Sequence, residues 1–387
     1  MSEYQAIVIG AGLTGSVMAE RMASQLGLKV LVLEQREHLA GNCYDEYDSN
    51  QILIHRYGPH LFHTDNLEVV DYLSQFTEWH FYEHRVLSKI DNQLVPIPFN
   101  LTSIEKCFPA DKAKQMIRCL LERYGEDARI PILELKKESD PLLAELSEFI
   151  YQKAFVNYTS KQWGVGPESI SPEVSARVPV VISRDDRYFL DLFQAVPKNG
   201  YTAMVERMLS HPNIDIELST PMDARVTLDW DNKTVLLDGD IFSGLVVYTG
   251  MLDQLIPDET EYLPYRSLRF EHQHLQQDQF QPVATVNYPN EEQYTRITEF
   301  KHLTTKVDTG TSIVYEYPCA YEPSKSLEPY YPVFTDEACS QYNSVRKNFS
   351  EFNNLILVGR LAEYKYYDMD DAVANALNIY KLKIQKI

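Results

Sequence analysis

Hydrophobic and polar positions near the N-terminus follow the pattern of a βαβ unit. The apolar run Ala6–Ile9 leads into a glycine-rich turn, a helical pattern follows over 16–26, and a second apolar run over 29–33 ends at the acid Glu34. Short apolar runs that alternate with a helical stretch are typical of strands in a parallel sheet. This segment therefore predicts the start of an α/β domain.

The turn after the first run has the glycine spacing G-x-G-x-x-G. Gly10 would allow a tight turn, Gly12 would let a pyrophosphate approach the backbone, and Gly15 would let helix and strand pack closely. The helix N-terminus would hold the phosphates, and Glu34 would accept hydrogen bonds from a ribose. The turn thus predicts a dinucleotide site; a glycine-rich turn in an ordinary α/β protein would leave Glu34 unexplained.

Later segments predict elements of several kinds. Positions 64–76 look helical, and 84–99 have the pattern of a β-hairpin. Lys, Glu, Leu and Ala recur at helical spacing over 102–157, which predicts a small helical subdomain, and the pattern breaks over 158–164. Aromatic and β-branched residues alternate with polar ones over 262–317, which predicts an antiparallel sheet.

Two further apolar runs are expected to return to the first sheet. Leu245–Tyr248 precedes Thr249-Gly250, and the run at 354–359 precedes a helical pattern over 368–382. Strands that end in such turns place ligand contacts at the carboxyl edge of a parallel sheet. We predict one discontinuous domain (1–80, 200–250 and 335–387), a mainly helical unit (81–160), and a unit with a mobile loop and the antiparallel sheet (161–199 and 251–334).

Composition narrows the classes of function. The 56 acidic residues outnumber 36 basic ones, so the net charge of −20 argues against binding to nucleic acid or to an anionic membrane surface. Tyrosine is abundant, at 26 residues against 3 tryptophans. Its flat face and hydroxyl suit pockets for sugars, bases and phosphates, although many tyrosines are expected to pack between subdomains.

The cysteines and the absence of targeting patterns indicate the cellular compartment. The five cysteines are scattered without a C-x-x-C pair, which predicts reduced thiols rather than disulfides or a zinc site. The N-terminus runs straight into the first strand, and no apolar run approaches membrane-spanning length. We therefore expect a soluble cytoplasmic protein without membrane insertion.

Several polar residues are candidates for chemistry. His60 and His63 could be metal ligands, but no third ligand cluster is evident nearby, so we predict no metal. Arg177 and Arg296 could hold a diphosphate, although arginines more often pair with surface carboxylates. The acids that start at Asp368 could cap a helix or take part in chemistry.

Motifs of hydrolases and P-loop enzymes are missing from the sequence. The residues alone therefore favour a flavin- or nicotinamide-dependent enzyme with a separate aromatic substrate domain.

The chain also resembles bacterial UDP-galactopyranose mutases from end to end. The stretches that carry the resemblance are Gly10–Gly15, Gly41–Tyr44, Tyr57–Thr64, Thr159–Gly164, Tyr265–Leu268, Tyr294–Ile297, Glu316–Pro318, Glu328–Val333 and, most specifically, Gly359–Met369. Their shared order makes a chance match implausible.

The resemblance implies an FAD enzyme that interconverts UDP-galactopyranose and UDP-galactofuranose without net redox change. In such enzymes the N5 atom of the reduced flavin attacks the anomeric carbon of the sugar, UDP leaves, and a flavin–sugar iminium recloses as the five-membered ring. The resemblance further implies an FAD-binding Rossmann-like domain with an inserted helical subdomain and an antiparallel β-sheet subdomain. It also implies a UDP-sugar partner, a homodimer, and a role in supplying galactofuranose for a surface polysaccharide.

The same resemblance implies roles for individual residues. Residues implied for catalysis are Arg177, Arg296, Asp368, Tyr366 and His63. Residues implied for substrate binding are His84, Phe155, Tyr158, Thr159, Trp163, Arg177, Tyr188, Asn287, Arg296, Tyr317 and Tyr366, with His84 at a position that varies in the family. Residues implied for FAD binding are Gly10, Gly12, Thr14, Gly15, Glu34, Gly41, Asn42, His60, Leu61, Arg360, Met369, Asp370, Asp371, Ala372, Val373 and Ala374.

Two stretches, 253–264 and 319–327, depart from the family pattern. They leave the sugar open, because related mutases act on UDP-N-acetylgalactosamine or dTDP-fucose. An FAD-dependent oxidoreductase of the amine oxidase type stays an alternative, since it would share the N-terminal motif. A nucleotide-sugar binding protein without activity is disfavoured by the retained Arg177, Arg296 and Asp368.

Overall fold

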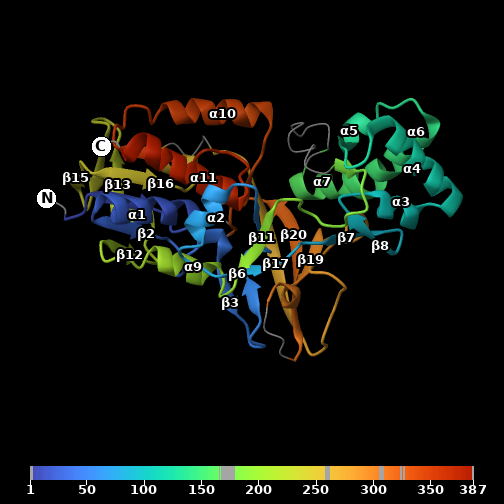
Figure 1. Ribbon diagram of the computed structural model, residues 1–387. Helices are drawn as coiled ribbons and strands as arrows, with labels where there is room; N and C mark the ends of the chain where they lie inside the picture. Colours follow the sequence, from blue (N-terminus) through green and yellow to red (C-terminus); the bar gives the residue numbers. More distant parts are fainter. Residues whose placement is uncertain are drawn as a thin grey trace.

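Three parts of the chain are arranged along one axis in the computed structural model (Figure 1). A parallel sheet with α1 and α11 lies at the left, a group of helices that includes α3, α4 and α6 lies at the right, and the long strands β17 and β20 lie between them. The described residues are 3–164, 166, 179–257, 262–304, 309–322, 325 and 327–385. Among their helices, none combines the length and the apolar character that a membrane span requires.

The N-terminal βαβ unit is confirmed. Five parallel strands form a sheet in the order β12-β2-β1-β16-β22. They are β1 (Ala6–Ile9), β2 (Val30–Leu33), β12 (Ile214–Glu217), β16 (Leu245–Tyr248) and β22 (Leu355–Leu357). The two apolar runs predicted to return to the first sheet therefore do so, since β16 pairs with β1 and β22 pairs with β16.

Alternation within the strands builds a core on each face of this sheet. Val8 and Val32 pack with α1 (Leu13–Leu26), α9 (Tyr201–Met208) and α11 (Met369–Ile379). Ile7 and Leu31 pack on the other face with β13 (Val226–Asp229), β14 (Thr234–Leu237) and α10 (Asp336–Lys347). The exposed strand β15 (Asp240–Ile241) pairs with β14 and completes a β-meander. Successive strand residues point to opposite faces, so an all-apolar strand is buried on both sides.

The predicted antiparallel sheet is present and is larger than expected. Its seven strands have the order β21-β17-β20-β19-β18-β7-β8. They are β21 (Tyr331–Pro332), β17 (Tyr265–Leu275), β20 (Thr311–Ala320), β19 (Arg296–Glu299), β18 (Thr285–Asn287), β7 (Val86–Ile90) and β8 (Gln93–Ile97). The hairpin β7–β8 joins the sheet through a parallel pairing with β18, whereas the sequence grouped it with the helices over 81–160.

The helical unit contains α3 (Leu101–Cys107), α4 (Ala110–Tyr124), α5 (Ile132–Leu135), α6 (Pro141–Ile150) and α7 (Asn157–Trp163) around its own core. The predicted break over 158–164 is wrong, because a π-helical turn over 151–156 leads directly into α7. Helix α7 ends at Gly164, where Arg266 donates hydrogen bonds to the carbonyls of Lys161 and Gln162. This cap comes from a distant strand, so local sequence could not reveal it.

A small sheet connects the parts. Strands β5 (Phe62–Thr64), β11 (Phe193–Pro197) and β6 (Trp79–Phe81) pair in antiparallel fashion. The helix predicted over 64–76 is therefore shorter, since β5 takes its start and Asn66 caps α2 (Leu67–Leu73). The remaining elements are β3 (Asp45–Tyr47), β4 (Leu53–His55), β9 (Arg129–Pro131), β10 (Pro179–Val181), a π-helical turn (Tyr380–Ile384) and 3-10 turns at Gly41–Cys43, Met222–Ala224, Leu252–Leu255 and Phe300–Leu303.

Candidate active site

A single cavity of about 1400 Å³ runs from the carboxyl edge of the parallel sheet to the antiparallel sheet. At one end it is lined by Gly10, Glu34, Thr249 and Gly359, each of which follows a strand of the parallel sheet. At the other end it is lined by Arg296 of β19 and Asn287 of β18. The volume exceeds the roughly 300–1,000 Å³ of a usual small-molecule site, so there is room for two ligands side by side.

Most of the residues singled out in the sequence lie on the wall of this cavity. They are Gly10, Gly12, Thr14, Gly15, Glu34, Gly41, Asn42, His60, Leu61, His63, His84, Tyr158, Trp163, Tyr188, Asn287, Arg296, Arg360, Tyr366, Asp368, Met369 and Ala372.

The glycine turn has the geometry that a phosphate-binding turn requires. Gly10 has φ 102°, and a Cβ there would lie 2.2 Å from the Thr249 hydroxyl oxygen. A Cβ on Gly15 would lie 1.9 Å from the Gly10 carbonyl oxygen, so α1 approaches β1 more closely than any side chain permits. A Cβ on Gly12 would meet only the Gly41 Cα, at 3.8 Å, which leaves the backbone accessible from the cavity.

Glu34 and Arg36 form the adjoining wall. The buried Glu34 carboxylate accepts hydrogen bonds from the backbone N–H groups of Ala11 (2.8 Å) and Arg36 (2.9 Å). The Arg36 guanidinium donates from Nη2 to Asn42 (3.0 Å) and to Glu328 (2.5 Å). Its Nε and Nη1 are buried and have no hydrogen-bond partner among the described residues. Sequence reasoning missed Arg36, although its position two residues after Glu34 was a signal.

The turn between β22 and α11 faces the same end of the cavity. Gly359 has φ 105°, and its N–H donates to the buried Glu363 carboxylate at 2.9 Å, which fixes the backbone of Arg360. Asp368 is the N-cap of α11, and its N–H donates to Asp371 at 3.4 Å. The helix-cap interpretation of these acids is therefore confirmed, and it leaves a role in chemistry open.

Four of the residues implied for FAD binding do not line the cavity. They are Asp370, Asp371, Val373 and Ala374. Asp370 accepts a hydrogen bond from the Thr64 hydroxyl at 2.7 Å, and Val373 is buried in the core beside the sheet.

At the far end, Arg296 lies between an acid and a phenol. Its guanidinium is 3.2 Å from the Glu316 carboxylate across the β19–β20 pair, and its Nη2 donates to the Tyr158 hydroxyl at 2.9 Å. Burial lowers the pKa of Arg296, but Glu316 and the phenol groups of Tyr158, Tyr331 and Tyr188 together raise it by more, so the net pKa lies well above its usual value. The cavity thus carries a permanent positive charge inside a strongly acidic protein.

Uncharged polar groups surround this arginine. Burial, together with the nearby Arg296, lowers the pKa of His84 to about 3, so its imidazole is neutral at physiological pH. Within the described structure, His84 Nδ1 and Asn287 Oδ1 are buried without hydrogen-bond partners. Because buried polar groups are nearly always paired in proteins, such atoms beside a cavity point to a polar ligand.

Other substrate-binding candidates lie off the main cavity. Phe155 and Thr159 line a small apolar pocket of about 40 Å³ that shares Tyr158, Tyr188 and Asn287 with the cavity wall. Tyr317 does not line the cavity, because it neighbours Glu316 on β20 and points to the opposite face, where Arg269 covers its ring at 4.0 Å. Arg177 lies outside the described residues.

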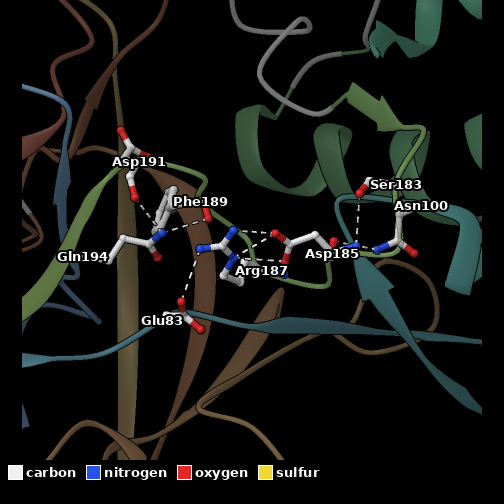
Figure 2. A network of polar contacts seen from close by, with 8 residues as sticks. All are labelled: Glu83, Asn100, Ser183, Asp185, Arg187, Phe189, Asp191 and Gln194. Carbon is white, nitrogen blue, oxygen red and sulfur yellow. Dashed lines mark hydrogen bonds and ion pairs between the residues drawn. The ribbon is translucent and has the colours of Figure 1, made fainter. Parts of the chain in front are cut away.

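The segment 183–194 borders the cavity through Tyr188 and Phe189. Figure 2 shows the polar contacts made by this segment. Arg187 pairs with Asp185 and Glu83, and Asn100 donates to the Asp185 carbonyl at 3.2 Å. The charge of Arg187 is therefore neutralised locally, as in an ordinary surface ion pair. No group of His, Cys, Asp and Glu suited to a metal occurs among the described residues.

Comparisons with known proteins agree with this geometry. The model of the UDP-galactopyranose mutase family matches residues 153–366, and that of an NAD(P)-binding Rossmann-like domain matches residues 8–76. A UDP-galactopyranose mutase of Mycoplasma genitalium is 33% identical, with 96% of this chain and 93% of that protein covered. A dTDP-fucopyranose mutase of Escherichia coli is 32% identical, with 98% of each chain covered.

Solved structures share the fold. A crystal structure of reduced UDP-galactopyranose mutase matches with a TM-score of 0.71 at 16% identity and covers 98% of this chain and 95% of that one. Putrescine oxidase bound to putrescine matches with a TM-score of 0.59 at 14% identity, with 98% of each chain covered.

Proposed function

This chain belongs to the UDP-galactopyranose mutase family and is an isomerase, and we propose that it interconverts UDP-galactopyranose and UDP-galactofuranose with reduced FAD. One observation carries the proposal. A phosphate-binding turn and a half-buried, charged arginine face each other across one continuous cavity. A dinucleotide bound at the glycine turn and a nucleotide sugar bound at Arg296 would meet within this cavity.

The residues at the parallel sheet fit FAD. The backbone at Gly12 is open to a pyrophosphate, and the N-terminus of α11 offers a second set of N–H groups. Two buried nitrogens of Arg36, Nε and Nη1, have no hydrogen-bond partner in the described part of the chain, and Glu34 is an acceptor for ribose hydroxyls. When bound in its reduced form, FAD supplies a nucleophilic nitrogen for the anomeric carbon without net oxidation of the sugar.

The residues at the antiparallel sheet fit the diphosphate and the base of UDP. The planar Arg296 fork matches phosphate oxygens, and Tyr158 holds it in place. We propose that Arg177 is the second arginine and that Tyr188 and Tyr366 contact phosphates, whereas Tyr317 points away from the cavity. The small pocket beside Phe155 and Thr159 would receive the uracil ring, and Trp163 would lie near it.

The sugar itself would lie between the two ends. Near Arg296, His84 and Asn287 hold buried polar atoms that have no partner within the described ranges, and these atoms suit sugar hydroxyls. We propose that His63 and Asp368, which also line the cavity, lie close to the reacting atoms. The relative that is a dTDP-fucopyranose mutase makes dTDP-fucose an alternative substrate, and UDP-N-acetylgalactosamine is another.

The deciding experiment compares reduced with oxidised enzyme. We expect the FAD-loaded, dithionite-reduced protein to convert UDP-galactofuranose to UDP-galactopyranose, followed by chromatography. Absence of conversion under reducing conditions, or equal conversion by the oxidised enzyme, would contradict the proposal. Parallel reactions with dTDP-fucofuranose and with UDP-N-acetylgalactosamine rank these sugars as substrates by kcat/KM. Oxygen-dependent turnover of an amine would instead favour an FAD-dependent oxidoreductase.

Substitution of Arg296 tests the substrate end separately. We expect Arg296→Ala to abolish turnover and UDP binding while the protein keeps the flavin absorbance near 450 nm. Arg118→Ala is the matched control, because Arg118 is 71% exposed on α4 and only bonds along its own helix. Loss of the flavin in Arg296→Ala would show that this arginine is structural.

Assembly and location remain part of the proposal. We propose a homodimer in the cytoplasm that supplies galactofuranose for a surface polysaccharide. Sedimentation velocity of the FAD-loaded protein tests the oligomeric state.

A further inference from the structure

The imidazole of His63 is held by two side chains from the segment 183–194. Its ring is stacked on Phe189 with the ring centroids 3.5 Å apart and an interplanar angle of 15°. Its Nδ1 is 3.1 Å from Asp191 Oδ2, and the side chains of His63 and Asp191 are only 16% and 26% exposed. Phe189 also stacks on His84, so its ring lies between two histidines of the cavity wall.

The backbone that carries Phe189 and Asp191 is itself fixed (Figure 2). The Gln194 side-chain amide donates to the carbonyls of both residues, at 3.0 and 3.1 Å. The N–H of Leu192 donates to Asp65 at 2.8 Å, next to the strand that bears His63. These hydrogen bonds fix the backbone at Asp191 and at its neighbour Leu192. The Asp191 carboxylate is therefore held beside His63 and is not a freely moving surface group.

The chemistry of this contact determines the histidine tautomer. An ionised carboxylate only accepts hydrogen bonds, so Nδ1 of His63 must carry the hydrogen. In the neutral imidazole the lone pair then lies on Nε2. Since Nδ1 is engaged by Asp191, Nε2 is the nitrogen that His63 can offer to a ligand in the cavity it lines.

We propose that Asp191 is a positioning residue that holds His63 as the Nδ1–H tautomer, so that Nε2 accepts a hydrogen bond from an O–H or N–H group of a ligand in the cavity. The use of this acceptor in turnover rests on the proposed function, whereas the tautomer does not. A hydrogen bond to a charged group favours one form by about 10- to 100-fold, which is enough to set the tautomer.

The tautomer can be read directly by NMR. Protein labelled with ¹⁵N-histidine gives long-range ¹⁵N–¹H correlations in which protonated and unprotonated ring nitrogens differ in shift, and His63→Gln assigns the signals of His63. We expect protonated Nδ1 and unprotonated Nε2 in the native, FAD-loaded protein. We expect Asp191→Ala to lower the ratio of the Nδ1–H tautomer to the Nε2–H tautomer of His63 by at least about tenfold.

Glu83→Gln is the matched control, because it removes an acid that anchors Arg187 in the same segment but touches neither His63 nor Asp191. It should leave the tautomer unchanged. Nε2–H as the major form in the native protein would overturn the proposal, even if Asp191→Ala failed to fold. An unchanged tautomer in Asp191→Ala would overturn it as well.

Ligand additions identify the donor. A shift of the Nε2 signal on loading with FAD alone supports a cofactor donor, and a shift only after UDP-galactose is added supports a sugar hydroxyl. No shift in either case would overturn the acceptor role. Because no turnover is measured, failure of the mutase assay would leave these results intact.

Discussion

The pairing of Arg296 with Glu316 makes opposite predictions for the empty and the ligand-bound protein. Glu316→Gln keeps the shape of the side chain but removes the charge that balances Arg296 in a buried site, where the carboxyl side chain is 4% and the guanidinium side chain 27% exposed. The empty protein should lose stability. A bound diphosphate should restore it, because it supplies the missing negative charge.

The magnitude follows from the burial of the pair. Removing one partner of a buried ion pair costs about 3–5 kcal/mol, and we take the lower end since the guanidinium is partly exposed and glutamine still offers an oxygen. For 387 residues the unfolding entropy near the midpoint is roughly 0.8 kcal/mol/K, so Tm should fall by about 4 °C. In the wild type, the Glu316 carboxylate and a phosphate at Arg296 would be like charges ~6 Å apart, which repel by about 3 kcal/mol at an effective dielectric constant of ~20. Because Glu316→Gln removes this repulsion, the variant should bind UDP at least about tenfold more tightly than the wild type.

Differential scanning calorimetry with and without UDP, and titration calorimetry with UDP, measure both effects. The control is Glu145→Gln, which breaks the exposed pair with Lys112 on the helical unit and should shift Tm by less than about 1 °C with no change in UDP affinity. Weaker UDP binding by Glu316→Gln, or an unchanged Tm, would refute the reasoning that Glu316 competes with the ligand for Arg296.

Two further substitutions test the cofactor end and the sheet. Gly15→Ala would place a Cβ 1.9 Å from the Gly10 carbonyl, so the purified protein should lack flavin absorbance. Gly27→Ala meets nothing within 4 Å and has only the strain of its φ of 67°, roughly 1–2 kcal/mol, so it should keep the cofactor. Buried Glu299 accepts hydrogen bonds from Phe280, Gln281 and Thr311; burial raises its pKa, but these bonds and His302 lower it by more. Glu299→Gln should therefore cost roughly 3 kcal/mol in urea unfolding at pH 7, and the difference from wild type should shrink as the pH falls through that depressed pKa.

Local sequence was sufficient for the part of the fold in which hydrophobicity and glycine placement coincide. The strands around Gly10 are buried on both faces, so they appear as continuous apolar runs, and a close helix approach demands Gly15. The hairpin over 84–99 could also be predicted from the sequence, because Asp91 and Asn92 are residue types that tolerate the positive φ of a hairpin turn, which both adopt. Such features depend only on near neighbours in the chain.

Features that depend on contacts between residues far apart in the chain could not be predicted from the sequence. Helix α7 continues past position 158 because Arg266 of β17 caps it, and β7 joins the large sheet because β18 pairs beside it. Asp191 meets His63 although 128 positions separate them. The face on which Tyr317 points depends on strand register, which no motif encodes.

The Glu316 carboxylate explains how an acidic protein can keep an anion site without a ligand. An unpaired guanidinium in this position would cost several kcal/mol of desolvation, and Glu316 offsets that cost by direct pairing across β19 and β20. The substrate must then displace part of this pairing, so a single phosphate gains little, whereas a diphosphate can accept from Arg296 and from a second arginine at once. Selectivity for nucleotide diphosphates over monophosphates would thus arise from the competing acid, and UMP should bind far more weakly than UDP until Glu316 is removed.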